Sequence, residues 1–267
     1  MFVDHAALRA SLAESDLSHS LRGELESLAR PAARLLSEPG APTQPGQSRF
    51  GGHPDLPTGF TWPLHAGTGQ PLPFLAQINL ADVDGLTDLD LPATGHLLFF
   101  YDSVDQPWGY RLADRAGFRL LHVPDGELTP QEGPDPLPPH RLTAAPGVSV
   151  PSASSQAFDW SEEDDAYLDW SDSTPDPTEN HQLGGWPAVI QEDDMEVKSS
   201  VLSRGEEYRH GMTTEGDPGT WVLLAQFASS ADGDWSWGDD GCLYVWMRHE
   251  DIRAGAWENA HLILQCF

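Results

Sequence analysis

Positive charge is scarce in this sequence of 267 residues. Lys and Arg number 14 against 42 Asp and Glu, so the formal net charge is −28, and Lys198 is the only lysine. A surface this acidic repels phosphate groups. The composition therefore excludes nucleic acid and anionic membranes as expected partners.

Cysteine and long apolar runs are also missing. Cys242 and Cys266 are too few for a disulfide framework or a cysteine-based zinc site, so we expect buried, reduced thiols. No run approaches the roughly 18 apolar residues of a membrane span. Asp4 and Glu14 stand where a signal peptide would be cationic and then apolar. We therefore expect a cytoplasmic protein whose hydrophobic residues, 39% of the chain, form an ordinary core.

The motifs of common catalytic sites are absent as well. Residues 147–151 (GVSVP) lack the second glycine of a Gly-x-Ser-x-Gly nucleophile elbow. Residues 249–250 (HE) are not followed by a histidine one helical turn later, and residues 67–69 (GTG) lack the rest of a dinucleotide loop. The sequence thus leaves enzymatic activity open but favours a protein without it.

What the sequence does contain begins with helical periodicity in residues 1–38. Leucines recur there at mostly three- and four-residue spacings, which predicts amphipathic helices: Leu8, Leu12, Leu21, Leu25, Leu28, Leu35 and Leu36. Asp16 or Ser18 could cap the second helix. Residues 39–47 are rich in Pro and Gly and are predicted to form a linker. The domain body is expected to begin at Ser48.

Beyond the linker, short apolar runs bounded by Gly, Pro and Asp predict β-strands. Their ranges are 74–79, 96–101, 110–113, 118–122, 221–227, 242–247 and 261–266. Eight prolines between positions 124 and 151 predict a loop. Residues 142–197 hold 13 acids and no Lys or Arg. We therefore predict a Pro-rich and acidic insert at 142–180.

Three short motifs occur twice in the same order, which indicates an internal repeat. The pairs are FGGHP (50–54) with LGGWP (183–187), FLAQI (74–78) with LLAQF (223–227), and GHLLFF (95–100) with GCLYVW (241–246). We predict an α+β fold in which an N-terminal helical segment precedes a β-rich core of two structurally similar halves. The halves span residues 48–141 and 181–267 and form one domain.

These motifs, with WSWGDDGCLYVWMRHEDI and LILQCF near the end of the chain, resemble the YwqG-like family, a bacterial domain family of unknown function. The resemblance runs from about Arg49 to Phe267. It implies an α+β fold with a duplicated β-rich core, and it weakly implies a binding role associated with toxin and immunity loci. The acidic insert departs from the family pattern. So does the segment at 229–234, where a run of aspartates is diluted to SSADGD.

The repeat places Gln77 and Gln226 at equivalent positions inside apolar strands. A buried amide needs hydrogen-bond partners to offset its desolvation. Each glutamine could bond to loop backbone near its own Gly-Gly-x-Pro element. Alternatively, both glutamines could line a polar pocket between the halves, together with His53 and His181.

The loop at 232–240 is the candidate metal site. Asp232, Asp234, Asp239 and Asp240 could present carboxylates to Ca²⁺ or another divalent cation. Their spacing matches no EF-hand loop, and solvated turn carboxylates are the alternative reading. No other cofactor is predicted.

The leading functional hypothesis is a cytoplasmic, non-enzymatic protein-binding module whose acidic face, including the insert, recognises a basic protein. Trp160 and Trp170 of the insert are candidates for contacts with that partner, or else anchors that hold the insert to the body. The alternative is a divalent-metal-binding protein or metal-dependent enzyme that uses loop 232–240. A third reading, salt adaptation, predicts acids spread evenly over the surface.

Overall fold

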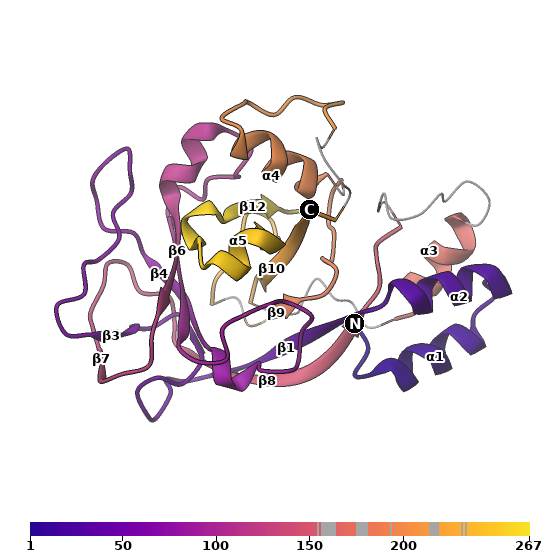
Figure 1. Ribbon diagram of the computed structural model, residues 1–267, viewed down its shortest axis with the longest axis horizontal. Helices are drawn as coiled ribbons and strands as arrows, with labels where there is room; N and C mark the ends of the chain where they lie inside the picture. Colours follow the sequence, from indigo (N-terminus) through magenta and orange to yellow (C-terminus); the bar gives the residue numbers. More distant parts are fainter. Residues whose placement is uncertain are drawn as a thin grey trace.

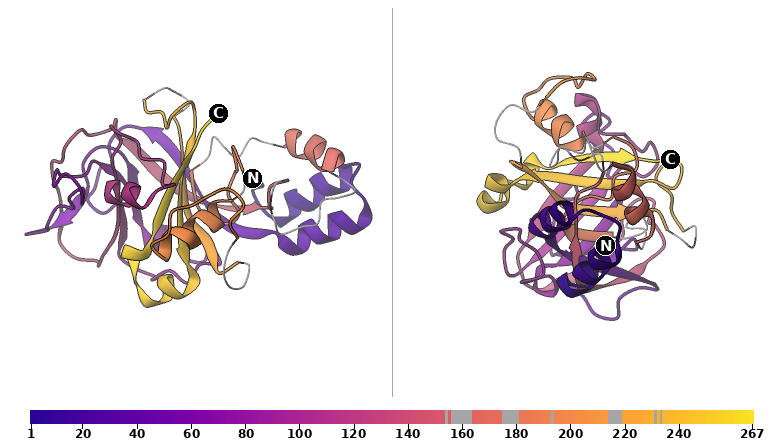
Figure 2. Two further views of the ribbon diagram at one scale, coloured as in Figure 1. Left: turned by 90° about the horizontal axis from the view of Figure 1, so that it is seen from above. Right: turned by 90° about the vertical axis from the view of Figure 1, so that its right-hand side faces the viewer.

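The computed structural model describes residues 1–153, 155, 164–174, 181–192, 194–213, 219–230, 232 and 234–267. The body of the molecule is a curled β-sheet, and helices α1 (His5–Glu14), α2 (His19–Leu28) and α3 (Asp164–Asp172) lie together at one end of it (Figures 1 and 2). Two long strands, β1 (Arg30–Pro39) and β8 (His140–Ser149), extend from the body toward these helices (Figure 1).

The other elements are short. The remaining strands are β2 (Arg49–Phe50), β3 (Asp55–Pro57), β4 (Phe74–Asn79), β5 (His96–Tyr101), β6 (Phe118–Val123), β7 (Leu128–Pro130), β9 (His181–Gly184), β10 (Trp221–Ala228), β11 (Cys242–Arg248) and β12 (His261–Gln265). The remaining helices are α4 (Met195–Ser203), α5 (His249–Ala254) and the 3₁₀ helices η1 (Leu80–Asp82), η2 (Leu112–Gly117) and η4 (Trp257–Asn259). In the part of the chain that the structure describes, no helix is long and apolar enough to cross a membrane.

Ten strands form one antiparallel sheet in the order β12-β11-β10-β9-β1-β8-β2-β4-β5-β6. The central pair, β1 and β8, keeps one register over ten residue pairs, from Arg30 opposite Ser149 to Pro39 opposite His140. On one side of this pair β2, β4, β5 and β6 follow in chain order, and on the other side β9, β10, β11 and β12 do the same. The order is therefore mirrored about β1 and β8.

The β-rich α+β class is confirmed, and so are the predicted strands that became β4, β5, β6, β10, β11 and β12, within one or two residues at their ends. Both halves also share local details. The pairing of β4 with β5 shifts register at Leu75, and that of β10 with β11 shifts at Leu224, its equivalent. All four glycines of the Gly-Gly-x-Pro elements have positive φ. The internal duplication itself stays a prediction.

Three secondary-structure predictions are wrong. Residues 30–39 form strand β1 instead of continuing a helix: Pro31 disfavours helix, and alternate residues such as Ala33 and Leu35 are buried. Residues 140–149 form β8 instead of a loop, because ten pairings with β1 satisfy their backbone. Residues 110–113 form no strand in the structure; the chain turns there into η2.

Helices α1 and α2 confirm the N-terminal prediction up to Leu28. Asp4 caps α1 by accepting a hydrogen bond from the amide of Ala7 at 2.8 Å, and Ser18 caps α2 by accepting one from the amide of Leu21 at 3.1 Å. Their leucines pack with Phe2, Val148, Tyr167 and Trp170 into a small core of their own. Helix α3 of the insert thus packs against the N-terminal helices and not against the sheet interior.

The main core fills the interior of the curled sheet. Side chains from both halves meet there, among them Phe50, Phe99, Phe227 and Leu243, and Leu35 of β1 lies among them. Trp235 and Trp237, from the loop between β10 and β11, enter the same core. Both indole N–H groups donate to the carbonyl of Ala228, at 3.0 and 3.2 Å. The loop therefore covers one end of the core.

Two cationic side chains, those of Arg49 and Lys198, are buried, and each forms an ion pair. Arg49 of β2 forms an ion pair with Asp55, whose side chain is fully buried. The same Asp55 carboxylate accepts a hydrogen bond from the amide of Gly46 at 2.8 Å, and the Asp55 amide donates to Gln77 Oε1 at 2.8 Å. Lys198 of α4 is 6% exposed, with its ammonium 2.5 Å from Asp194 and 4.1 Å from the centre of the Tyr110 ring.

We expect Asp55→Asn to destabilise the fold by about 3 to 5 kcal/mol, because it leaves the buried Arg49 charge without a counter-charge. Glu26→Gln is the matched control, since it makes the same change of charge in the exposed Arg9–Glu26 pair and should cost less than about 1 kcal/mol. Urea unfolding of both variants measures the difference. Equal losses would contradict a structural role for the buried pair.

Candidate functional site

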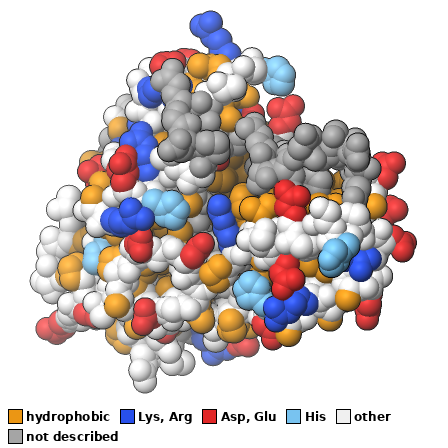
Figure 3. All heavy atoms as spheres, turned by 45° about the vertical axis from the view of Figure 1, so that its right-hand side comes forward, with side chains coloured by type: hydrophobic (Ala, Val, Ile, Leu, Met, Phe, Trp, Pro, Cys, Tyr) orange, Lys and Arg blue, Asp and Glu red, His pale blue; other side chains and the backbone are white. Residues whose placement is uncertain are grey.

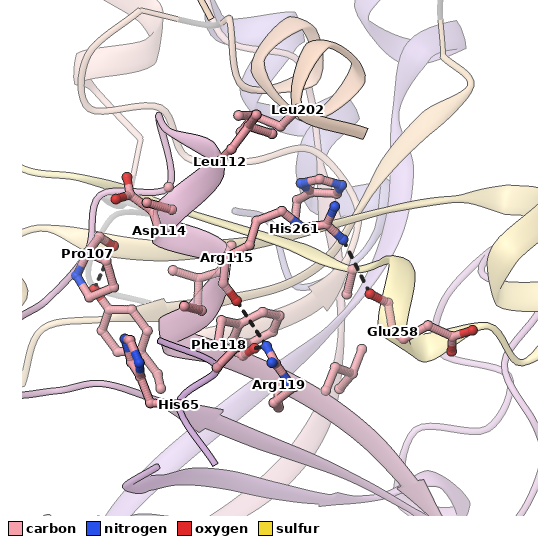
Figure 4. A pocket seen from close by; sticks show the side chains of 18 of the residues that line it. His65, Pro107, Leu112, Asp114, Arg115, Phe118, Arg119, Leu202, Glu258 and His261 are labelled. Carbon is pink, nitrogen blue, oxygen red and sulfur yellow. Dashed lines mark hydrogen bonds between the residues drawn. The ribbon is translucent and has the colours of Figure 1, made fainter. Parts of the chain in front are cut away.

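A cavity of about 770 Å³ lies where the two outer strands of the sheet, β6 and β12, approach each other (Figure 4). Its walls come from η2, β6, η4 and β12, with Leu202 of α4 at one side. Much of the lining is apolar, including Leu112, Phe118, Trp257 and Leu262. A cavity of this size and composition is typical of small-molecule sites.

The chain before η2 fixes the position of this wall. Leu264 of β12 donates its amide to the carbonyl of Trp108 at 3.0 Å, so residues near 108 lie along the free edge of β12. A Cβ on Gly109 would lie 1.9 Å from the backbone oxygen of Leu262, and the φ of Gly109 is +79°. Only glycine allows so close an approach. Asp114 then starts η2 by accepting the amides of Tyr110 and Arg111 at 3.0 and 3.2 Å.

Two arginines line the cavity without a carboxylate partner among the described residues. Arg115 donates to the carbonyl oxygen of Glu258 at 3.5 Å, and Arg119 donates to the carbonyl oxygen of Arg115 at 3.0 Å. The carboxylate of Glu258 points away from Arg115 (Figure 4), and that of Asp114 is held by backbone amides. Burial, and then the charge of Arg119, lower the pKa of Arg115. The polar lining therefore contains two guanidinium groups that form no ion pair in the described structure, although Asp114 and Glu258 also line the cavity.

His261 also lines the cavity and is 2% exposed. Its Nδ1 atom is buried and has no hydrogen-bond partner in the described part of the chain, and the same holds for Nε1 of Trp246, its cross-strand neighbour. Burial, followed by the charges of Arg115 and Arg248, lowers the pKa of His261 to about 3. The imidazole is thus neutral at physiological pH. Its Nδ1 is therefore available for a hydrogen bond to a further polar group.

The sequence predicted a polar pocket lined by Gln77, Gln226, His53 and His181. None of these four is among the described residues that line the cavity. Each glutamine bonds within its own half. Gln77 Oε1 accepts the amide of Asp55, and Gln226 Oε1 accepts the amide of Ala188 at 2.9 Å. These two amides both follow the proline of a Gly-Gly-x-Pro element. The geometry matches the local-bonding alternative.

The two histidines, His53 and His181, make different contacts. His181 accepts the amide of Ala228 at 3.0 Å and stacks on Phe50 with ring centres 5.3 Å apart. Burial, and to a smaller extent His140, lower the pKa of His181 to about 4. His53 contributes its carbonyl oxygen to the Arg49 guanidinium at 2.8 Å. A functional role for the four residues stays a prediction.

The four aspartates of loop 232–240 are all exposed. Asp234 bonds His140 at 2.8 Å, while the φ of Asp240 is +46° in a tight turn. Across the residues with described positions, no three His, Cys, Asp or Glu side chains are placed to hold a metal ion. The divalent cation at Asp232, Asp234, Asp239 and Asp240 therefore stays a prediction.

Of the two insert tryptophans, Trp160 lies outside the described residues. Trp170 is buried, donates its indole N–H to Ser11 Oγ at 2.9 Å and stacks on Phe2 with ring centres 5.9 Å apart. These contacts fit the anchoring alternative for Trp170. On the face shown in Figure 3, acidic side chains are scattered among basic and apolar ones. A basic protein partner stays a prediction.

Sequence reasoning missed Arg115, Arg119 and His261, three of the polar residues that line the cavity. A usable signal was present, because three of the 14 basic residues, Arg111, Arg115 and Arg119, fall within nine positions of a strongly acidic chain. His261 carried no such signal. Its importance arises from burial beside Arg115, which lies 146 positions away.

The chain was compared with protein-family models and with curated proteins. Residues 48–266 match a family model described as Domain of unknown function (DUF1963). No curated protein matches the chain. The matched segment runs from just before β2 through β12 and excludes α1, α2 and β1.

Because the imidazole of His261 is buried, we expect its contribution to the free energy of unfolding to depend on pH. The unfolded residue takes up a proton near its ordinary pKa of 6.5 and the folded residue near 3, so the unfolded state binds more protons between these values and stability falls as pH falls. In the ligand-free protein, the stability advantage of wild type over His261→Gln should shrink by up to about 1.4 kcal/mol per pH unit below pH ~6.

Urea unfolding of both proteins at several pH values down to ~4 measures this difference. His210→Gln, which changes an exposed imidazole, is the matched control. A difference between wild type and His261→Gln that stays constant with pH would contradict the burial of a neutral imidazole.

Proposed function

The chain belongs to the family described as Domain of unknown function (DUF1963), and we propose that it binds a small anionic molecule in the cavity between β6 and β12. The observation that carries this proposal is the pair Arg115 and Arg119, which have no carboxylate partner in the described structure although the chain holds 42 acids. The proposed role of this cavity is binding without catalysis.

The energetics favour an anion between these arginines. Arg115 is partly desolvated and faces a like charge, which lowers its pKa, so its charged form is disfavoured until a counter-charge arrives. Hydrogen bonds from a guanidinium to an anion contribute roughly 1.5 to 3 kcal/mol each. Carboxylate and phosphate both suit the planar donor fork of arginine.

The remaining lining defines the rest of the ligand. Phe118, Leu112 and Trp257 provide an apolar wall, so the anionic group should be attached to an apolar or aromatic body. Neutral His261 can accept or donate one hydrogen bond at Nδ1. A monoanionic aromatic acid with a further hydroxyl group satisfies all three features.

We propose the YwqG-like type within the family, supported by the motifs between Arg49 and Phe267. We also propose that the two halves arose by duplication. The mirrored strand order, the shared register shifts at Leu75 and Leu224, and the equivalent bonds of Gln77 and Gln226 support it.

We expect isothermal titration with benzoate, salicylate and phenyl phosphate to detect binding, with salicylate preferred to benzoate because of its hydroxyl group. Arg115→Gln and Arg119→Gln should each weaken binding about 10-fold or more, the equivalent of roughly 1.4 kcal/mol. Comparing the carboxylates with phenyl phosphate identifies the preferred anion.

Arg9→Gln, on the distant helix α1, is the control of equal charge change and should bind as wild type does. Two results would overturn the proposal. One is no binding of any probe at millimolar concentration, and the other is equal weakening by all three variants, which would indicate a general charge effect.

A further inference from the structure

A second group of polar side chains lies apart from the cavity, at the end of β1 and β8 that is remote from the helices. Ser37 Oγ lies 2.9 Å from Nδ1 of His140, and Nε2 of His140 lies 2.8 Å from the carboxylate of Asp234. The three residues come from β1, from β8 and from the loop between β10 and β11. One imidazole thus connects a hydroxyl group to a carboxylate.

The chemistry of these partners assigns the imidazole proton. An ionised carboxylate only accepts hydrogen bonds, so Nε2 of His140 carries the hydrogen that points to Asp234. When the ring carries this hydrogen alone, Nδ1 presents its lone pair to the hydroxyl of Ser37. A hydroxyl group that donates to a carboxylate-oriented imidazole is the arrangement of an activated nucleophile.

The imidazole of His140 is buried, whereas Ser37 and Asp234 are exposed. His140 is 3% exposed, and its ring packs edge-on against Trp235 with centres 4.7 Å apart. Ser37 is exposed, and the side chain of Asp234 is 38% exposed. The base is therefore held rigidly and shielded from water, while the hydroxyl group is open to a substrate.

The surrounding structure fixes each member. In the register of β1 and β8, Pro39 lies opposite His140 and Ser37 opposite Leu142, so Ser37 and His140 are diagonal neighbours on one face. Asp234 directly precedes Trp235, whose indole N–H is bonded to Ala228 inside the core. The carboxylate is thus placed by a buried neighbour.

We propose that Ser37, His140 and Asp234 form a hydrolytic site for small acyl esters, independent of the anion cavity. Ser37 Oγ attacks the ester carbonyl carbon while its proton passes to Nδ1 of His140. The bond to the alcohol oxygen breaks, and the imidazolium returns that proton to the departing alkoxide. Water then attacks the acyl-serine, giving its proton to Nδ1, and the Ser37 oxygen leaves and is reprotonated. One ester and one water yield one acid and one alcohol.

In this scheme Ser37 and His140 are the catalytic residues, and Asp234 is a positioning residue that holds the ring and stabilises the imidazolium. Because Ser37 stands on an exposed strand and not inside an enclosed cavity, the site accepts short acyl groups and selects little among alcohols. The Gly-x-Ser-x-Gly motif is not required, since the geometry comes from a strand and not from a strand-to-helix elbow.

The test uses the full-length protein, a fluorophosphonate probe and p-nitrophenyl acetate. Wild type should carry the probe on the peptide that contains Ser37, identified by mass spectrometry, and should release p-nitrophenol faster than buffer. Ser37→Ala should abolish both signals, and Asp234→Asn should lower both rates about 100-fold or more.

Ser27→Ala removes an exposed serine of α2 that bonds only to the helix backbone at 2.7 Å and should leave both signals unchanged. Thermal melting accompanies every variant and shows which of them remain folded. The proposal is overturned if Ser37 is not labelled, or if Asp234→Asn lowers the melting temperature while leaving labelling and hydrolysis unchanged. Either result would mean that the hydrogen bonds among the three residues only hold the loop in place.

Discussion

The antiparallel pair of β1 and β8 is the constraint on which the rest of the structure depends. Ten residue pairs hold these strands in one register, and each half of the sheet grows outward from one side of the pair. Near Arg30 and Ser149 the pair leads to the helical unit, and near Pro39 and His140 it supports the loop that covers the core. A slip of β1 by one residue would exchange the two faces of that strand, which would move Leu35 out of the core and Ser37 away from His140.

Charge is arranged in two ways in this molecule. Acidic side chains dominate the composition, yet the buried cations Arg49 and Lys198 each have a carboxylate close by, as desolvation requires. Arg115 and Arg119 are half-buried and have no carboxylate partner among the described residues, and they lie where β6 and β12 approach without pairing. The unclosed edges leave room for a ligand, and the unpaired guanidinium groups define its charge.

Six of the twelve strands in the described part of the chain could be predicted from sequence, because runs such as FLAQIN and HLLFFY are apolar on both faces. Strands β1 and β8 could not. Leu35 and Leu36 continue a helical spacing, and Pro146 suggests a loop, so only the long pairing of two segments about 110 positions apart makes both extended. The candidate sites escaped prediction for the same reason. Arg115 meets His261 and Ser37 meets His140 through topology, and no local pattern around these residues records it.

The single lysine has a consequence for covalent chemistry. Lys198 is the only lysine in the sequence, and its ammonium lies between Asp194 and the Tyr110 ring. The folded protein therefore offers no exposed lysine side chain to acylating reagents, amine-directed crosslinkers or lysine-specific proteases. Modification of Lys198 requires α4 to separate from the sheet. The rate at which Lys198 reacts therefore reports how often this part of the fold opens.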